Sequence, residues 1–565
     1  MTQVVPLTLD ASPADEHPWR RLQIQAPRGD ETVLAQPPLD SAADWAERNH
    51  AALETANVNI QGRPLHLLRD WAREEACRAA HAYTSTWCAA AALPERPSRV
   101  FVGGHQPLLF HPGVWIKNFA VGGLARREGA IGLNLVVDND TLTSASIRVP
   151  AGTPDAPHVL NVAFDAARPA QPWEEARILD RTVFDQFGAA IEQAIRPWGY
   201  EPLARQFWSA AVQHAQVSNT LADCLTAARN QFERRAGVEN LELPISRMCQ
   251  LDPFLWFASH LFAQIPRFHR IYNEVVHEYR KINKVRSRTH PVSDLRIDGD
   301  WLEAPFWVWN AGDHRRKPVF ACVAEREILL ADDLQAVFAR LPLTAHGDAC
   351  CAVKVLRTLH AAGIRLRTRA LTTTLFARLC LADLFVHGIG GAKYDEMTDR
   401  IIARFFRIPA PTFLALSATV RLPLPAFSVD SVDVVRLAGL MRDLEFNPER
   451  HLGSPPPVAA ASLIAEKRRL IAEQVESRKP ATDRQWGRRD KRGGYARFQR
   501  FQQLNQELGQ FTSNARQQLE TELTEAHAQL AADAVLRNRE YAFCLYPEDK
   551  LTRFFARLET GGGPG

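Results

Sequence analysis

The chain has 565 residues, which is long for a single hydrophobic core and predicts more than one structural unit. Hydrophobic residues make up 46% of the sequence and charged residues 23%, a balance typical of globular proteins rather than of disordered chains. The 68 basic and 64 acidic side chains leave a formal net charge of +4, a balance that argues neither for nor against nucleic acid as a partner.

Cysteine usage and hydropathy indicate a cytoplasmic protein. The nine cysteines form no C-x-x-C pair, which argues against a zinc ribbon or a redox dithiol, and an odd number fits a reducing compartment. The first residues show no basic region followed by an apolar segment, and no run of about 18 apolar residues occurs. We therefore expect neither a secretory signal nor a membrane partner, and we interpret all nine cysteines as structural.

The predicted elements describe an α/β protein, with a Rossmann-like parallel sheet, helical insertions and a C-terminal arm of antiparallel helices. A strand, turn, helix and strand between residues 98 and 140 predict this core, because parallel strands require such a crossover. The expected domains are a helical lead-in (1–95), the first half of the core (96–170), a helical insertion (171–295), a β-rich connection (296–340), the second half of the core (341–455), and a helical hairpin or coiled coil with a tail (456–565).

The segment FVGGHQPLLFHPGVWIKN, 101–118, joins the first predicted strand to the next helix. Its two glycines are expected to allow positive φ and a close approach of a ligand to backbone N–H groups, and the helix start near Pro112 favours an anion. The alternative is a strand-to-helix corner in which the histidine bonds to backbone. The functional candidates are His105 for catalysis and Gly103, Gly104, Gln106, His111 and Lys117 for binding.

Acidic residues follow the second predicted strand in the sequence DND. Asp138 and Asp140 would reach the same crevice, since the carboxyl ends of parallel strands meet at one edge of the sheet. They are candidates for catalysis, for holding an amine or a ribose hydroxyl, or for binding Mg²⁺. A turn or a helix cap is the alternative, because Asp and Asn favour both.

A third motif, HGIGGAKYD, places a histidine and three glycines after a later strand and before a helix. The spacing matches neither the dinucleotide fingerprint nor the P-loop, so its similarity to the first motif is what favours function. A glycine turn at a helix start is the alternative. The candidates are His387 for catalysis on the opposite wall of the crevice, and Gly388, Gly390, Gly391 and Lys393 for binding.

Two basic segments give weaker indications. Arg365, Arg367 and Arg369 alternate, so on a strand they would share one face and attract an anion, although a solvated edge is the commoner cause. The segment DHRRKPVF, 313–320, could cover a phosphate as a basic loop, but a solvated hairpin is the preferred interpretation.

The C-terminal block predicts a helical hairpin. Apolar residues from Phe501 to Leu530 step by three or four along a helix of about 40 residues. A shorter apolar stripe, 463–475, marks the helix before it. The loop between them is basic and carries Trp486 and Tyr495, a mixture found on nucleic-acid surfaces, but a solvated hairpin tip is the preferred interpretation.

In this order the motifs resemble the cysteine-adding enzyme family of bacillithiol biosynthesis, and the similarity spans most of the chain. The matching elements are Gly104-His105-Gln106-Pro107 with Pro112-Gly113 and Lys117, then Asp138-Asn139-Asp140, the segment 367–391, TFLALSATV, and the tail YAFCLYPEDKLTRFF.

The resemblance implies a Rossmann-like core related to nucleotidylyltransferases of the H-x-G-H type, helical insertions, and a coiled coil that pairs two subunits. The family's proposed reaction joins the carboxyl group of cysteine to the amine of a glucosamine conjugate. The family's Gln-Gln is His105-Gln106 here, and its Glu-Asp-His-Asp lacks the histidine here. The first departure brings the site closer to nucleotidylyltransferase chemistry.

The motifs support three hypotheses of function. The leading one is a ligase that binds ATP or another nucleotide or phosphorylated ligand, with Mg²⁺ as a further candidate cofactor. It would form an amide bond on a small amine or amino sugar and act as a homodimer through the C-terminal helices. The second is a nucleotidylyltransferase that releases pyrophosphate. The third is a non-catalytic interaction protein whose arm would contact nucleic acid through Arg488, Arg489, Lys491 and Arg492.

Overall fold

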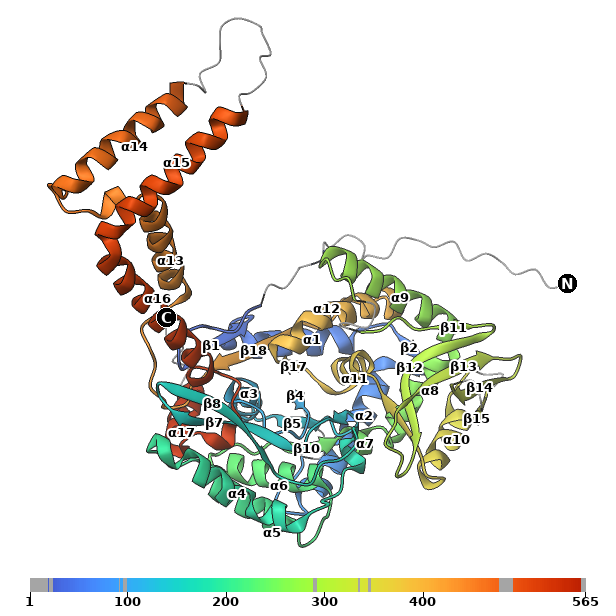
Figure 1. The fold of residues 1–565 in the computed structure, drawn as a ribbon. Coiled ribbons are helices and arrows are strands. Elements are labelled where there is room, and N and C mark those ends of the chain that lie inside the picture. The colour runs from blue at the N-terminus through green and yellow to red at the C-terminus, as the bar shows by residue number, and fades with distance from the viewer. Residues whose placement is uncertain are drawn as a thin grey trace, which may run out of the picture. The chain divides into compact units, whose positions relative to one another are not determined.

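The computed structural model describes residues 19, 24–90, 92–94, 99–287, 292–333, 336–343, 347–476 and 491–559. Contacts divide the chain into two compact units (Figure 1). The first comprises Met1–Val149, Leu160–Pro423 and Arg539–Gly565, and the second comprises Pro150–Val159 and Leu424–Asn538. Each unit is described separately below.

The first unit contains a six-stranded sheet made of β1 (Thr32–Gln36), β4 (Val100–His105), β5 (Ile131–Val136), β10 (Leu241–Pro244), β17 (Leu384–His387) and β18 (Phe413–Thr419). The order across the sheet is β1-β18-β17-β4-β5-β10, and only β1 is antiparallel to its neighbour (Figure 1). In chain order the parallel strands lie as 3-2-1-4-5, an arrangement compatible with a Rossmann-like core.

The parallel strands are mostly apolar, as expected where helices cover both faces of a sheet, and the buried Asn134 of β5 and Glu242 of β10 are exceptions. All seven residues of β18 are buried, as are all four of β17 and the first four of β4. Val100, Phe101 and Val102 in β4 are fully buried. Polar side chains therefore collect beyond the strand ends, where the chain turns into loops and helices.

Two strands of this sheet come from segments in which the sequence predicted none. Strand β10 lies within 171–295, so the prediction that this segment is only an insertion is wrong: the core sheet passes through it, with Leu241 opposite Leu133 of β5. Strand β1 lies in the predicted lead-in and pairs with β18. Both strands are short, so neither contains enough residues to show a period of two.

The helix that follows the first motif begins at Pro112, as predicted. Proline suits the first helical position because the N–H group that it lacks would have no acceptor within the helix there. The helix packs against β4, β5 and β18.

The helices of the first unit are α1 (Ala42–Glu54), α2 (Leu65–Thr84), α3 (Pro112–Arg127), α4 (Arg181–Ile195), α5 (Ala204–His214), α6 (Leu221–Arg235), α7 (Ile245–Met248), α8 (Asp252–Ala263), α9 (Ile265–Ile282), α10 (Cys350–Ala361), α11 (Ala370–Phe376), α12 (Ile389–Ile401) and α17 (Glu548–Glu559).

A second, antiparallel sheet occupies the segment predicted to be a β-rich connection (296–340) and extends beyond it. It consists of β11 (Ile297–Asp298), β12 (Trp301–Asn310), β13 (Lys317–Val323), β14 (Glu327–Asp332), β15 (Ala336–Pro342) and β16 (Ile364–Thr368). Strand β16, which the sequence analysis assigned to the second half of the core, pairs with β12 instead, with Arg367 opposite Trp307.

Three smaller strand pairs complete the described β-structure. They are β2 (Asn59–Ile60) with β3 (Arg63–Pro64), β6 (Thr141–Leu142) with β9 (Gln171–Pro172), and β7 (Ser146–Thr153) with β8 (Ala156–Ala163).

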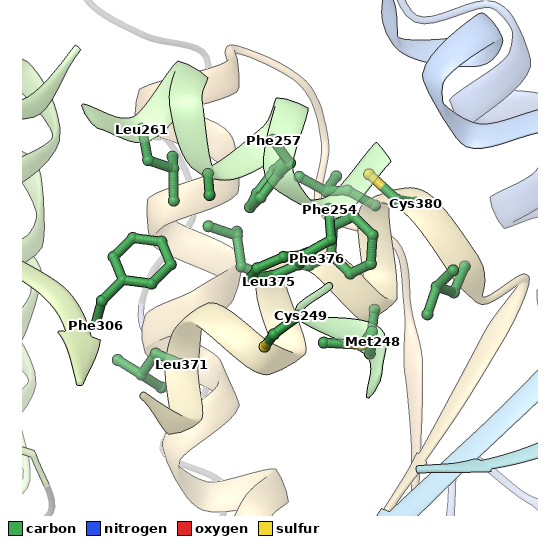
Figure 2. Packing of buried hydrophobic residues seen from close by; sticks show 14 of the residues in the cluster. Met248, Cys249, Phe254, Phe257, Leu261, Phe306, Leu371, Leu375, Phe376 and Cys380 are labelled. Carbon is green, nitrogen blue, oxygen red and sulfur yellow. The ribbon is translucent and has the colours of Figure 1, made fainter. Parts of the chain in front are cut away.

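Aromatic and aliphatic side chains of α8, α11 and β12 form part of the hydrophobic core of the first unit (Figure 2). The ring of Phe376 meets Phe254 edge-on at 5.2 Å and lies 5.4 Å from Phe257. Phe306 of β12 joins the same cluster, so the antiparallel sheet shares a core with the elements that carry the parallel one.

The second unit contains α13 (Ser431–Phe446), α14 (Val458–Glu476), α15 (Lys491–Gly509) and α16 (Ser513–Leu536). Helix α14 packs against α15, and α13 packs against α16. The predicted helix of about 40 residues is interrupted by a 3-10 turn, Gln510–Thr512, and the unit already includes α13, which the sequence analysis placed in the core.

The basic loop between α14 and α15 was the basis of the nucleic-acid hypothesis. Trp486, Arg488 and Arg489 lie outside the described residues, as do the side chains of Lys491 and Arg492. In the part of the chain that the structure describes, no helix is long and apolar enough to cross a bilayer.

The C-terminal tail belongs to the first unit and not to the helical arm, contrary to the predicted domain division. The backbone N–H of Phe543 donates to the carbonyl of Phe110 at 2.8 Å, and its ring lies 4.2 Å from that of Trp115. The tail therefore packs against the residues of the first motif that join β4 to α3.

Candidate functional site

The first and third motifs meet where the strand order of the parallel sheet reverses. His105 ends β4, His387 ends β17, and these two strands are neighbours with Val386 opposite Gly103. In open α/β sheets, ligands bind in the crevice outside the strand ends at this switch point. The structure thus brings together two motifs that are about 280 residues apart in the sequence.

Lys117 connects the two motifs. Its ammonium group donates to the carbonyl of Gly104 at 2.6 Å, and its Cε lies 4.0 Å from the position that a Cβ on Gly388 would take. The side chain is 4% exposed, and in the described part of the chain no carboxylate forms an ion pair with it. Burial, together with the positive charge of Arg229, lowers the pKa of Lys117 to about 8.

Both ring nitrogens of His105 face acceptor atoms. Its Nδ1 lies 3.0 Å from the carbonyl oxygen of Gln106, and its Nε2 lies 3.0 Å from Oδ1 of Asn118. A neutral imidazole has only one N–H to donate. Burial, Arg229 and Lys117 hold the pKa of His105 well below its usual range, so the ring is neutral at pH 7. A bound anion beside the ring would offset the charges of Arg229 and Lys117 and favour protonation of the second ring nitrogen.

A buried polar network lies behind His105. The amide nitrogen of Asn118 donates to Glu233 at 2.7 Å, which fixes the amide so that its oxygen faces the histidine. Glu233 also accepts from Trp115, and both of its oxygens accept from Nη1 of Arg229, whose Nη2 donates to Glu242 at 2.6 Å. Helix α6, which sequence reasoning treated as an insertion, thus positions His105 through Asn118.

The two glycines of the first motif serve packing rather than an unusual backbone conformation. Gly103 and Gly104 are residues of β4, and neither has positive φ, so that expectation is wrong. A Cβ on Gly103 would lie 3.3 Å from Val121, and one on Gly104 would lie 3.2 Å from both Cβ and the carbonyl oxygen of Leu135. Small residues here let α3 and β5 approach the end of β4.

His111 and Gln106 are both engaged by the protein itself. His111 is the N-cap of α3, where its Nδ1 accepts from the N–H of Gly113 at 3.1 Å. Burial, Arg539 and Lys117 lower the pKa of His111 to about 4, which keeps the ring neutral for this role. Gln106 donates from its side chain to Asp140.

The two predicted aspartates have different surroundings. Asp138 is 4% exposed and accepts from both the N–H and the hydroxyl of Ser246. Burial, with the nearby carboxylate of Glu174, raises the pKa of Asp138 to about 7, a value suited to proton transfer near neutrality. Asp140 is one-third exposed and lies 3.2 Å from a guanidinium nitrogen of Arg316.

The alternating arginines are each matched by a carboxylate, so they do not form an open anion site. Arg367 makes two hydrogen bonds to Glu174, of 2.9 and 2.8 Å, and Arg365 lies 3.4 Å from Glu175. Arg369 lies beyond the end of β16 and donates to Glu303 at 2.5 Å. These acids lie 66 to 193 residues away along the chain, so no local pattern could have revealed them.

The histidine of the third motif makes a buried hydrogen bond to an acid of α12. His387 Nε2 lies 2.9 Å from Asp395, which also accepts from Arg378. Burial by itself would raise the pKa of Asp395, but Arg378 and His387 together hold it well below its usual range. Gly388 is the N-cap of α12, Gly390 and Gly391 are exposed in its first turn, and Lys393 is half-buried one turn on.

Replacing Gly391 with alanine should displace His387, since a Cβ there would lie 2.6 Å from Nδ1 of the ring. Gly390→Ala is the matched control, because nothing lies within 4 Å of its Cβ position in the same helical turn. We expect the imidazole NMR signals of His387 to shift only in Gly391→Ala. Equal shifts in both variants would contradict this packing.

The carboxylates present do not fit a Mg²⁺ site. Both oxygens of Asp138 are engaged by Ser246, and Asp140 accepts from Gln106 and pairs with Arg316, which puts positive charge where a cation would bind. Among the residues that the structure describes, no group of three or more His, Cys, Asp or Glu side chains is arranged to hold a metal ion.

The residues that sequence reasoning missed carry no local signal. Arg229 and Glu233 are spaced i, i+4 on a helix, a pattern that most often marks a solvated face. Arg316 was noted only within a basic loop interpreted as solvated.

No protein-family model matches the chain, and no curated protein shows significant similarity to it.

Proposed function

We propose that this protein is an enzyme that binds a nucleotide or another phosphorylated ligand in the crevice beyond β4 and β17. The observation that carries the proposal is Lys117, a buried ammonium whose hydrogen-bond partner is a backbone carbonyl rather than a carboxylate. Buried charges in proteins are normally paired or bind an ion, so this position favours an anionic ligand. Nucleotides are among the ligands that bind in the crevice at a switch point of this kind.

The groups around Lys117 suit a phosphate. The first turn of α12 contributes N–H groups that have no acceptor inside the helix, and the positive end of its dipole favours an anion. In α3 the first N–H groups are already taken up by His111. Neutral His105 lies near Lys117 and can gain a proton when an anion arrives. We assign Lys117 and the start of α12, Gly388 to Gly391, to binding, and His105 to stabilising negative charge on the group being transferred.

The reaction that we propose is formation of a C–N bond on a small amine or amino sugar, as in the family that the motifs resemble. The nucleoside triphosphate would transfer its terminal phosphoryl group to the carboxylate and leave as the diphosphate. The amine would then attack the acyl phosphate, so that the C–N bond forms as the C–O bond to phosphate breaks and phosphate leaves. Asp138, whose pKa is raised to about 7 by burial and by Glu174, would take the proton of the attacking amine. Asp140 would hold the amine, and His387, fixed by Asp395, would line the opposite wall.

A nucleotidylyltransferase is the second candidate. The observation that favours it is a histidine at the end of the first parallel strand, beside the start of the following helix. Release of pyrophosphate without an amide product would identify this reaction, whereas the ligase needs both the amine and the carboxyl partner for turnover.

Calorimetry with ATP, ADP and CTP tests the site. We expect Lys117→Met to weaken nucleotide binding by about 10- to 100-fold, because a hydrogen bond to a charged group is worth roughly 1.5–3 kcal/mol. Lys354→Met, at an exposed position on α10, is the control and should bind normally. The free energy of unfolding of Lys117→Met should be unchanged or higher, since a buried ammonium is removed.

The same measurement has a predicted pH dependence. Lys117 is charged below a pKa of about 8 and loses its proton above it, so nucleotide affinity should be highest below pH 8 and fall as the pH rises through 8. This dependence should vanish in Lys117→Met. Failure of all three nucleotides to bind the wild type would overturn the nucleotide site.

A further inference from the structure

The turn between β12 and β13 reaches the carboxyl edge of the parallel sheet. Arg316, at the end of this turn, donates to the carbonyl of Asn139 at 3.0 Å and lies 3.2 Å from Oδ1 of Asp140. The N–H of Gly312 donates to Glu175 at 3.1 Å and fixes the other side of the turn. The antiparallel sheet therefore places a guanidinium beside the loop that follows β5.

A second guanidinium lies against the same aromatic ring. Arg369 lies 4.0 Å from the centre of the Trp307 ring, and Arg316 lies 5.2 Å from it. Burial lowers the pKa of Arg316, and Arg369 adds to that effect, while Asp140 only partly offsets it. Two guanidinium groups thus lie against one ring, Arg316 paired with Asp140 and Arg369 paired with Glu303.

Asp140 joins this cluster to the first motif. Its second oxygen accepts from the side chain of Gln106, the residue next to His105, and its first also accepts from the N–H of Thr141 at 2.8 Å. About 37% of the Asp140 side chain is exposed, and Arg316 is 21% exposed. The ion pair is therefore open to solvent and to a competing anion, in contrast to the buried pair of Arg367 with Glu174.

We propose that Arg316 is a ligand-binding residue, whose guanidinium exchanges Asp140 for an oxyanion group, phosphate or carboxylate, of the ligand held at Lys117. This inference rests on the proposed function. Asp140 stands in for that group while no ligand is bound, and a guanidinium suits this role because it can make two parallel hydrogen bonds to a phosphate or a carboxylate. Released from Arg316, Asp140 keeps its contact with Gln106 and remains at the crevice.

The test compares Arg316→Ala and Arg316→Lys with Arg315→Ala, which removes the same charge from an exposed position in the same turn. The probes are pyrophosphate, ATP and citrate, measured by calorimetry at low ionic strength and pH 7. We expect Arg316→Ala to weaken pyrophosphate binding at least 10-fold, Arg316→Lys to have a smaller effect, and Arg315→Ala to stay within twofold of the wild type. Citrate separates a carboxylate preference from a phosphate preference.

A variant at Asp140 distinguishes a ligand contact from a purely structural pair. Asp140→Asn removes the competing carboxylate, so it should tighten pyrophosphate binding several-fold, whereas a structural role predicts weaker binding. Equal affinities for Arg316→Ala and Arg315→Ala would overturn the inference, as would weaker binding by Asp140→Asn.

The outcomes also separate this inference from the proposed function. If citrate binds in an Arg316-dependent way while ATP, ADP and CTP do not bind, the nucleotide site fails and the role of Arg316 stands. If nucleotides bind but no probe depends on Arg316, only the further inference fails. If the wild type binds none of the probes, both fail.

Discussion

Gly113→Ala is expected to destabilise the protein by about 3 kcal/mol, because extra atoms in a packed core cannot be accommodated without backbone shifts. A Cβ at Gly113 would lie 2.2 Å from the carbonyl oxygen of Ala418, which is backbone and cannot rotate away. Helix α3 packs against β18, so the added methyl group would force the start of the helix away from the sheet. Urea unfolding monitored by circular dichroism measures the loss.

Gly123→Ala is the matched control for this prediction. It lies in the same helix, and nothing is within 4 Å of its Cβ position. There alanine should stabilise the protein by roughly 0.5–1 kcal/mol, because it restricts the unfolded chain and favours helix more than glycine does. If the two variants unfolded alike, the close approach of α3 to β18 would be refuted.

Arg229→Met should cost about 3–5 kcal/mol, the usual result of removing one partner of a buried ion pair. Arg229 is buried and donates to two carboxylates, Glu233 and Glu242, so the substitution leaves both without their cation. The geometry of His105 should change as well, since Glu233 holds Asn118 against it. Denaturant unfolding and the His105 ring signals in NMR report the two effects separately.

The loss of unfolding free energy in Arg229→Met should depend on pH. Burial already raises the pKa of Glu233 in the presence of Arg229. Without that cation, Glu233 in the folded protein would keep a proton that the same residue releases in the unfolded chain. Stability therefore falls as the pH rises, and the deficit should be larger at pH 8 than at pH 5. Arg235→Met, exposed on the same helix, is the control. A deficit independent of pH would argue against uncompensated carboxylates.

Much of the core was predictable from local patterns. The buried strand that contains Gly103 and Gly104, the proline that begins α3 and the apolar strand before Asp138 are encoded within a few residues of where they occur. The β-rich connection followed from its turn signals. Strands β1 and β10 were missed because their pairing with β18 and β5 depends on distant partners rather than on a periodicity of their own.

The candidate site divides in the same way. Sequence alone identified the two histidine motifs and the lysine, because a glycine-rich turn between a strand and a helix is a local feature. It did not show that Lys117 would be buried without a carboxylate, or that Arg316 would reach Asp140. Pairs such as Arg367 with Glu174, 193 residues apart, form only when two sheets are packed together.

The sequence by itself determined which residues can form turns, cap helices or build buried strands, since those properties follow from backbone torsions and from the polarity of near neighbours. The tertiary structure decided which charges are neutralised. Arg365, Arg367 and Arg369 each met an acid from a distant segment, whereas Lys117 met a backbone carbonyl. Burial and pairing fix the cost of a charge, and both depend on contacts that no stretch of sequence contains.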